Sequence, residues 1–131
     1  MSQDEAAEDR EDGVDSGGKV ADPGVLLARV TTRLSAQLGE PLAPGLYLVA
    51  TPIGHLADLT VRAIAVLARA DIVYCEDTRH SRTLLEAYGI GARLRPYHEH
   101  NGEAERPRVL AALADGKRVA LISDAGTPLI S

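Results

Sequence analysis

The sequence predicts an α/β fold with an open parallel sheet and flanking helices, preceded by a disordered acidic tail. From residue 45 onward, short apolar segments typical of buried strands alternate with longer segments of helical periodicity, in the order β-α-β-α-β-α-β. Right-handed crossovers join strands of this kind into a parallel sheet. Hydrophobic residues make up 45% of the chain, which is sufficient for a core, and the only aromatic residues are four tyrosines.

The first 44 residues are expected to form a tail, a short helix and a linker. Residues 1–16 carry seven acidic side chains and one arginine, with so few apolar groups that burial cannot offset the entropy lost on ordering. Between residues 26 and 38 apolar side chains recur every four positions, as on one face of a helix. Asp22 is the predicted N-cap, Pro23 the first helical residue and Gly39 the stop.

Four apolar segments are the predicted strands. The first, second and fourth are apolar on both faces, as is usual for strands buried in a parallel sheet. The third contains Pro96, which lacks an N–H donor and therefore favours an edge position or a late strand start. The four predicted strands span residues 46–51, 72–76, 93–99 and 118–123.

Three segments between the strands have helical periodicity and span residues 59–70, 79–89 and 106–116. Gly89 and Gly116 end the second and third helices, and Pro107, which has no N–H, fits near the start of the third. Two helices have an evident inward face, formed by Val61, Ile64, Ala65 and Ala68 in the first and by Leu84, Leu85 and Tyr88 in the second.

Composition excludes several classes of protein. A length of 131 residues suits one compact domain at most, and a single cysteine excludes a disulfide framework. No apolar run approaches the roughly 20 residues of a membrane span, and no secretory signal opens the chain, so we expect a cytoplasmic protein. The net charge of −5 comes from the tail, because residues 45–131 carry ten basic and ten acidic side chains.

The unusual polar residues follow the strands and therefore lie at one edge of the predicted sheet, where ligands bind in open parallel sheets. The loops after the four strands span residues 51–60, 76–82, 98–101 and 123–128. The opposite ends of the strands, which begin at Gly45, Asp71, Gly91 and Lys117, show no comparable pattern. This asymmetry is the main evidence for a site.

Each loop also has a purely structural interpretation. The glycines and prolines of the first and fourth loops occur in ordinary turns, Glu76 and Asp77 suit the N-terminus of a helix, and Cys75 suits a small buried position. His98 and His100 share one face of an extended segment. Two histidines with no third ligand rarely hold a metal, so we expect no metal site.

Three common motifs are missing from the sequence: the P-loop G-x-x-x-x-G-K-[ST], the dinucleotide fingerprint G-x-G-x-x-G and the nucleophile elbow G-x-S-x-G. The pattern that remains combines Gly-Pro loops with an acid at the end of the second strand. It suits an adenosine-containing ligand, because backbone groups can hold the base and the acid can hold the hydroxyl groups.

Four motifs carry a resemblance to a known family: LYLVATPIGHLADLTVRAI, CEDTRHSRTLL, YHEHN and VALISDAGTPLIS, all between residues 46 and 131. In order and spacing they resemble the ribosomal RNA small subunit methyltransferase I family of the tetrapyrrole methylase superfamily. That family uses S-adenosylmethionine to methylate the ribose 2′-hydroxyl of a cytidine in 16S rRNA. His55 stands where an asparagine commonly follows TPIG, which is a mild departure.

The resemblance implies a role for each motif. Glu76 and Asp77 would face the reacting end, where either is expected as the general base, with His98 as the alternative. Arg79 and Arg82 would contact phosphate or ribose. The residues implied to line the S-adenosylmethionine site are Thr51, Pro52 and Gly54 in the first loop and Ser123, Asp124, Ala125, Gly126 and Thr127 in the fourth.

The resemblance also implies a longer protein with two α/β domains and the methyl donor in the cleft between them. Its partner would be 16S rRNA or the small ribosomal subunit, and a homodimer is expected at full length. Residues 45–131 would form most of the first domain, so the isolated chain is expected to be marginally stable, to associate through an open strand edge and not to methylate RNA. Two alternatives stay open: a methyltransferase of a tetrapyrrole or another small molecule, and a nucleotide-binding fragment without turnover.

We predict that Gly126→Val, introduced into the complete enzyme, weakens the binding of S-adenosylmethionine with little loss of stability. A glycine in this loop lets the backbone approach the ligand closely or adopt φ > 0, where a Cβ would clash. Calorimetric titration measures the affinity. Unchanged affinity at normal thermal stability would rule out this role for Gly126.

Overall fold

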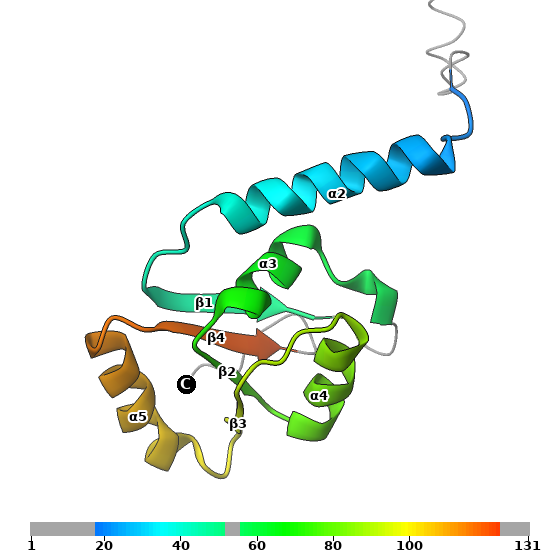
Figure 1. Ribbon diagram of the computed structural model, residues 1–131. Helices are drawn as coiled ribbons and strands as arrows, with labels where there is room; N and C mark the ends of the chain where they lie inside the picture. Colours follow the sequence, from blue (N-terminus) through cyan, green and yellow to red (C-terminus); the bar gives the residue numbers. More distant parts are fainter. Residues whose placement is uncertain (1–17, 52–55, 124–131) are drawn as a thin grey trace, which may run out of the picture. The chain divides into compact units, whose positions relative to one another are not determined.

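The computed structural model describes residues 18–51 and 56–123, and it confirms the predicted fold class (Figure 1). The strands form one open sheet in which all neighbours are parallel, in the order β1-β4-β2-β3. Strand β3 lies at an edge, as Pro96 predicts. The strand bounds are Gly45–Ala50 for β1, Ile72–Cys75 for β2, Leu94–Pro96 for β3 and Arg118–Ser123 for β4.

The helices alternate with the strands along the chain. Their bounds are Pro23–Gly39 for α2, Val61–Arg69 for α3, Thr78–Ala87 for α4 and Gly102–Ala114 for α5, with a short 3₁₀ turn η1 at Leu56–Asp58. No helix in the described part of the chain is both long and apolar enough to cross a bilayer.

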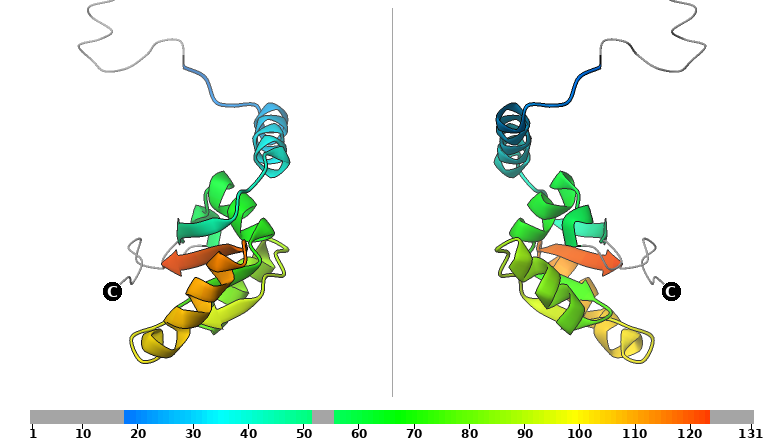
Figure 2. Two further views of the ribbon diagram at one scale, coloured as in Figure 1. Left: turned by 90° about the vertical axis from the view of Figure 1, so that its left-hand side faces the viewer. Right: turned by 90° about the vertical axis from the view of Figure 1, so that its right-hand side faces the viewer.

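The larger part of the core lies between the sheet and the pair α3 and α4. Leu67 of α3 and Leu85 of α4 are fully buried there, beside Val73 and Cys75 of β2. Leu84 and Leu85 form the inward face predicted for α4, and Gly89 follows the helix with φ +71°, the left-handed conformation that glycine adopts without strain. Figure 2 shows α3 and α4 on one side of the sheet and α5 on the other.

Helix α5 covers part of the opposite face of the sheet. Tyr74 and Val119 are buried beneath it, and the ring of Tyr74 meets the edge of Tyr97 with 5.9 Å between centroids. The cover does not extend over β1, where the side chains of Leu46 and Leu48 are 45% and 50% exposed. Strand β1 is therefore buried on one face only among the described residues, whereas apolar residues on both of its faces predicted burial on both.

The inward face predicted for α3 is partly wrong. Ala65 is buried as predicted, but Val61 and Ile64 are only half-buried and Ala68 is exposed. The other buried residues of the helix are Ala63, Val66 and Leu67. Seven of the nine residues of this helix are apolar, so apolar side chains also lie outside the face that the periodicity indicates.

The predicted start of the third helix at residue 106 is also wrong, because α5 begins at Gly102. The side chain of Asn101 closes the preceding turn: its Oδ1 accepts the amide of His98 at 2.8 Å, and its Nδ2 donates to the carbonyl of Pro96 at 2.9 Å. Pro107 consequently lies inside the helix, where it removes one intrahelical hydrogen bond. Its side chain is exposed, so its ring displaces no part of the core.

Helix α2 begins where the sequence predicts. The side-chain Oδ1 of Asp22 accepts the amides of Gly24 and Val25 at 2.8 and 3.3 Å, which satisfies two N–H groups of the first turn. The helix buries no residue, and Leu34 alone among its apolar side chains is half-buried. At its C-terminal end the carbonyls of Leu38 and Glu40 accept hydrogen bonds from the guanidinium of Arg69. The acidic tail of residues 1–16 lies outside the described residues.

We predict that Leu85→Ala lowers the free energy of unfolding by roughly 2–5 kcal/mol, because it removes a fully buried side chain and leaves a cavity in the core between the sheet and α4. Urea titration followed by circular dichroism measures the loss. Leu110→Ala is the matched control, since that leucine is 60% exposed on α5 and its truncation leaves stability nearly unchanged. Equal losses in the two variants would contradict the packing described above.

Candidate functional site

The first and fourth loops start side by side at the carboxyl edge of the sheet. The β1–β4 ladder ends with Ala50 opposite Ser123. The carbonyl oxygen of Ser123 then accepts two hydrogen bonds from Thr51, one from the amide at 3.0 Å and one from the hydroxyl Oγ1 at 3.4 Å. Both residues are buried. The two segments predicted to line the donor site therefore leave the sheet from one hydrogen-bonded point.

Glu76 and Asp77 follow β2 at the same edge, but their carboxylates differ in what they bind. Asp77 caps α4: its Oδ1 accepts the amides of Arg79 and His80 at 3.0 and 3.4 Å. Glu76 is exposed, and no side chain or amide in the described part of the chain donates to its carboxylate. Asp77 is thus held by the helix, whereas Glu76 has no such partner among the described residues.

The two arginines of α4 also differ. Arg79 is exposed in the first turn of the helix, at the end that faces the carboxyl edge. The guanidinium of Arg82 donates to the carbonyl of Ala92 at 3.0 Å and so ties α4 to the segment that precedes β3. The guanidinium of Arg79 makes no hydrogen bond or ion pair with the other described residues, while that of Arg82 donates at least one hydrogen bond to the backbone.

His98 follows β3, and its backbone and ring both take part in a tight turn. Its amide donates to the side chain of Asn101, and its ring Nδ1 accepts the amide of His100 at 3.2 Å. The rings of His98 and His100 lie 5.8 Å apart, centroid to centroid. Because Nδ1 is an acceptor in this arrangement, the neutral ring of His98 carries its proton on Nε2.

Glu76, Asp77 and His98 lie on either side of a topological switch point. The chain passes from β2 into α4 on one face of the sheet, and from β3 into α5 on the other face. Since α4 and α5 cover opposite faces, the loops after the neighbouring strands β2 and β3 turn in opposite directions at the carboxyl edge. In open α/β sheets such a point is where ligands bind.

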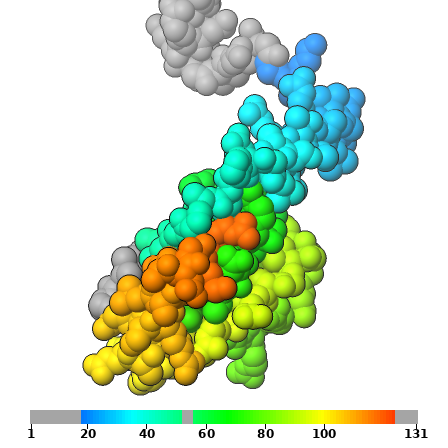
Figure 3. Space-filling model, turned by 60° about the vertical axis from the view of Figure 1, so that its left-hand side comes forward, coloured from blue at the N-terminus to red at the C-terminus, as the bar shows by residue number. Residues whose placement is uncertain are grey.

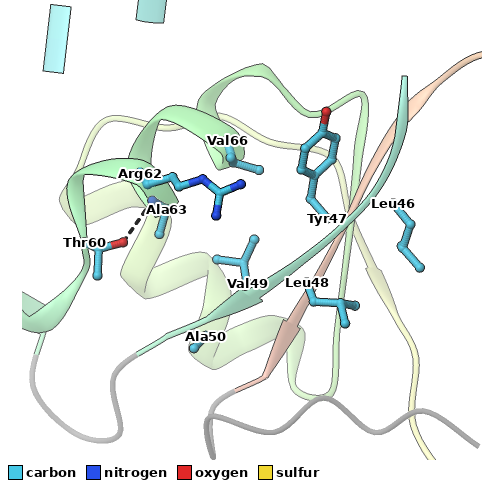
Figure 4. A pocket seen from close by; sticks show the side chains of 9 residues that line it. All are labelled: Leu46, Tyr47, Leu48, Val49, Ala50, Thr60, Arg62, Ala63 and Val66. Atoms are coloured by element: carbon cyan, nitrogen blue, oxygen red, sulfur yellow. Dashed lines mark hydrogen bonds between the residues drawn. The ribbon is translucent and has the colours of Figure 1, made fainter. Parts of the chain in front are cut away.

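A cavity of about 440 Å³ lies between β1 and α3, beside the end of β1. Figure 4 shows the side chains of Tyr47 and Val49 pointing from β1 toward α3, and those of Leu46 and Leu48 pointing away from α3. Arg62, from the first turn of α3, lines the cavity and is exposed. Arg62 is not among the site residues predicted from the sequence, although it follows the first loop by only two positions and is the only Lys or Arg between residues 45 and 68.

The remaining predicted site residues lie outside the described residues: Pro52, Gly54, Asp124, Ala125, Gly126 and Thr127. Of the predicted set, the structure thus brings Thr51 and Ser123 into direct contact and places Glu76, Asp77, Arg79 and His98 at the same edge. Among the described residues no group of three or more His, Cys, Asp or Glu side chains is arranged to hold a metal ion.

Comparison with known proteins gives a consistent result. The family profile for tetrapyrrole (corrin/porphyrin) methylases matches residues 45–131. A protein of Mesorhizobium japonicum named ribosomal RNA small subunit methyltransferase I is 65% identical over 92 residues, which is 70% of this chain and 31% of that protein. Proteins of the same name from Escherichia coli O157:H7 and Halalkalibacterium halodurans are 52% and 51% identical, each over 86 residues. The chain spans about 30% of the length of these curated relatives.

The geometry predicts the tautomer of His98. Long-range ¹H–¹⁵N correlation spectra recorded at a pH where the ring is neutral are expected to show a protonated Nε2 and an unprotonated Nδ1, because the amide of His100 donates to Nδ1. His80, whose side chain makes no such contact among the described residues, serves as the internal reference. Observation of the Nδ1–H tautomer for His98 would contradict the turn described here.

Proposed function

Because the chain belongs to the tetrapyrrole (corrin/porphyrin) methylase family, we propose that it forms part of an S-adenosylmethionine-dependent methyltransferase that modifies a ribose 2′-hydroxyl of a cytidine in 16S rRNA. The identity of 65% to a protein named ribosomal RNA small subunit methyltransferase I is the observation that carries the choice of RNA over a porphyrinoid. We assign this activity to the whole protein, because the relatives are more than three times as long as the region that this chain matches.

The geometry of the carboxyl edge supports a site for S-adenosylmethionine. The segments after β1 and β4 start from the contact of Thr51 with Ser123, so two Gly-Pro segments emerge together where open sheets bind ligands. Both anchor residues are buried and hydrogen-bonded, which gives the emerging backbone a rigid base. When bound, the cofactor supplies the sulfonium methyl group that the ribose oxygen attacks.

We assign the general base to Glu76 rather than to Asp77 or His98. The Oδ1 of Asp77 is occupied by two amides at the start of α4. The ring of His98 offers a donor at Nε2, because Nδ1 is already an acceptor. Glu76 alone of the three presents a carboxylate with no donor from the described residues, and it can accept the proton that leaves the 2′-hydroxyl.

The other groups at this edge would position the RNA. Arg79 is exposed beside Asp77 and can pair with a phosphate, which holds the RNA in register without reading its sequence. The Nε2–H of His98 can donate to a ribose or phosphate oxygen. Holding the hydroxyl in line with the sulfonium methyl group contributes much of the rate enhancement in a reaction of this kind.

We predict that Glu76→Gln, in the full-length protein, lowers kcat for methyl transfer to 30S subunits or 16S rRNA by about 10²–10⁴-fold, the usual contribution of a general base. The assay follows label from S-adenosyl-[methyl-³H]methionine into RNA. Alkaline hydrolysis then locates the methyl group, since a 2′-O-methylated ribose resists cleavage at its 3′ phosphodiester.

Asp77→Asn is the matched control, because asparagine caps a helix as well as aspartate does and the substitution also removes one carboxylate. It is expected to lower kcat far less than Glu76→Gln. A larger loss of kcat in Asp77→Asn than in Glu76→Gln would show that Asp77 is the general base. Label that enters a porphyrinoid and not RNA would overturn the proposed substrate altogether.

A further inference from the structure

A second cavity, of about 210 Å³, lies at the amino ends of β2, β3 and β4 and under the last turns of α5. It is lined by four cationic side chains from different parts of the chain: Arg93 and Arg95 at the start of β3, Arg108 on α5 and Lys117 before β4. Figure 3 brings forward the side of the molecule on which β1 and β4 begin, with the end of α5 and the start of β4 in orange. This edge is opposite to the proposed methyl-transfer site.

Two carboxylates beside this cavity, those of Asp71 and Glu105, are already paired. Oδ2 of Asp71 accepts the amide of Arg118 at 2.8 Å and its guanidinium at 3.4 Å. The backbone hydrogen bond from Arg118, followed by the side-chain bond, holds the pKa of Asp71 below its usual value. Glu105 is buried and binds Arg95 at 2.8 Å and Arg108 at 3.7 Å.

Positive charge remains after these pairs are formed. Arg93 and Lys117 are exposed, and neither has a salt-bridge partner within 4.0 Å among the described residues. Arg108 is 66% exposed and shares Glu105 with Arg95. Asp115, the C-cap of α5, is the other exposed carboxylate nearby. Because residues 45–131 carry equal numbers of basic and acidic side chains, a surplus of cations here is a local feature of the fold.

We infer that Arg93, Lys117 and Arg108 form a second contact site for the RNA, which binds the phosphodiester backbone at the amino edge of the sheet. The inference rests on the proposed function. Guanidinium and ammonium groups on separate elements can bind successive phosphates of an RNA strand, and such contacts carry no sequence information. At about 3.3 Å per residue, strands of this length put the site roughly 13–20 Å from the reacting edge, so it engages nucleotides several positions from the methylated ribose.

The test compares the full-length protein with the double variant Arg93→Gln/Lys117→Gln in binding to a fluorescent 16S rRNA fragment, measured by anisotropy over a range of salt. Loss of two phosphate contacts is expected to weaken binding about tenfold at 0.15 M salt and to reduce the slope of log Kobs against log[salt] by about 1.4. An RNA of unrelated sequence is expected to lose the same factor. In the methylation assay KM for RNA rises while kcat at saturating RNA is unchanged.

The control variant Arg29→Gln/Arg33→Gln removes the same charge from exposed positions of α2 and is expected to bind RNA as the unsubstituted protein does. Unchanged affinity and salt slope in Arg93→Gln/Lys117→Gln, or an equal loss in the control, would overturn the inference. The anisotropy assay measures RNA binding without turnover. Failure of the proposed function would instead appear as absence of RNA methylation by the unsubstituted protein, so the two outcomes can be told apart.

Discussion

The insertion of β4 between β1 and β2 is the interaction on which the rest of the structure depends. The β1–β4 ladder runs without a break from Gly45 opposite Arg118 to Ala50 opposite Ser123. At its carboxyl end it brings together Thr51 and Ser123, which are 72 positions apart in the sequence. At its amino end the same strand delivers Lys117 to the cationic cavity. The position of β4 thus contributes to both edges to which we assign function.

The opposite placement of α4 and α5 decides which groups meet at the carboxyl edge. Since the chain turns to different faces after β2 and β3, the acids of one loop and His98 of the other flank a switch point. Helix capping distinguishes the two acids: Oδ1 of Asp77 accepts two amides of α4, whereas the carboxylate of Glu76 has no donor among the described residues. We base the proposed role of Glu76 on this difference, which the sequence does not show because either acid suits the N-terminus of a helix.

Much of the fold is predictable because its signals are local. Apolar segments identify the strands, Pro96 indicates the edge position of β3, and Asp22 with Pro23 locates the start of α2. The inward face of α3 was predicted only in part, because seven of its nine residues are apolar and apolar side chains lie on more than one face. The cationic cavity was missed for a different reason: Arg93, Arg108 and Lys117 come from separate elements, and only the folding of α5 onto the sheet brings them to one cavity.

We propose that S-adenosylmethionine binds at the carboxyl edge, beside the contact of Thr51 with Ser123. Photocrosslinking of S-adenosyl-[methyl-¹⁴C]methionine to the full-length protein, followed by mapping of the labelled peptides, tests that placement directly. We expect label in peptides that contain residues 51–60 or 123–131 and protection of both by excess unlabelled S-adenosylmethionine. Protectable label confined to peptides from the amino edge of the sheet, such as residues 91–96 or 115–119, would contradict it.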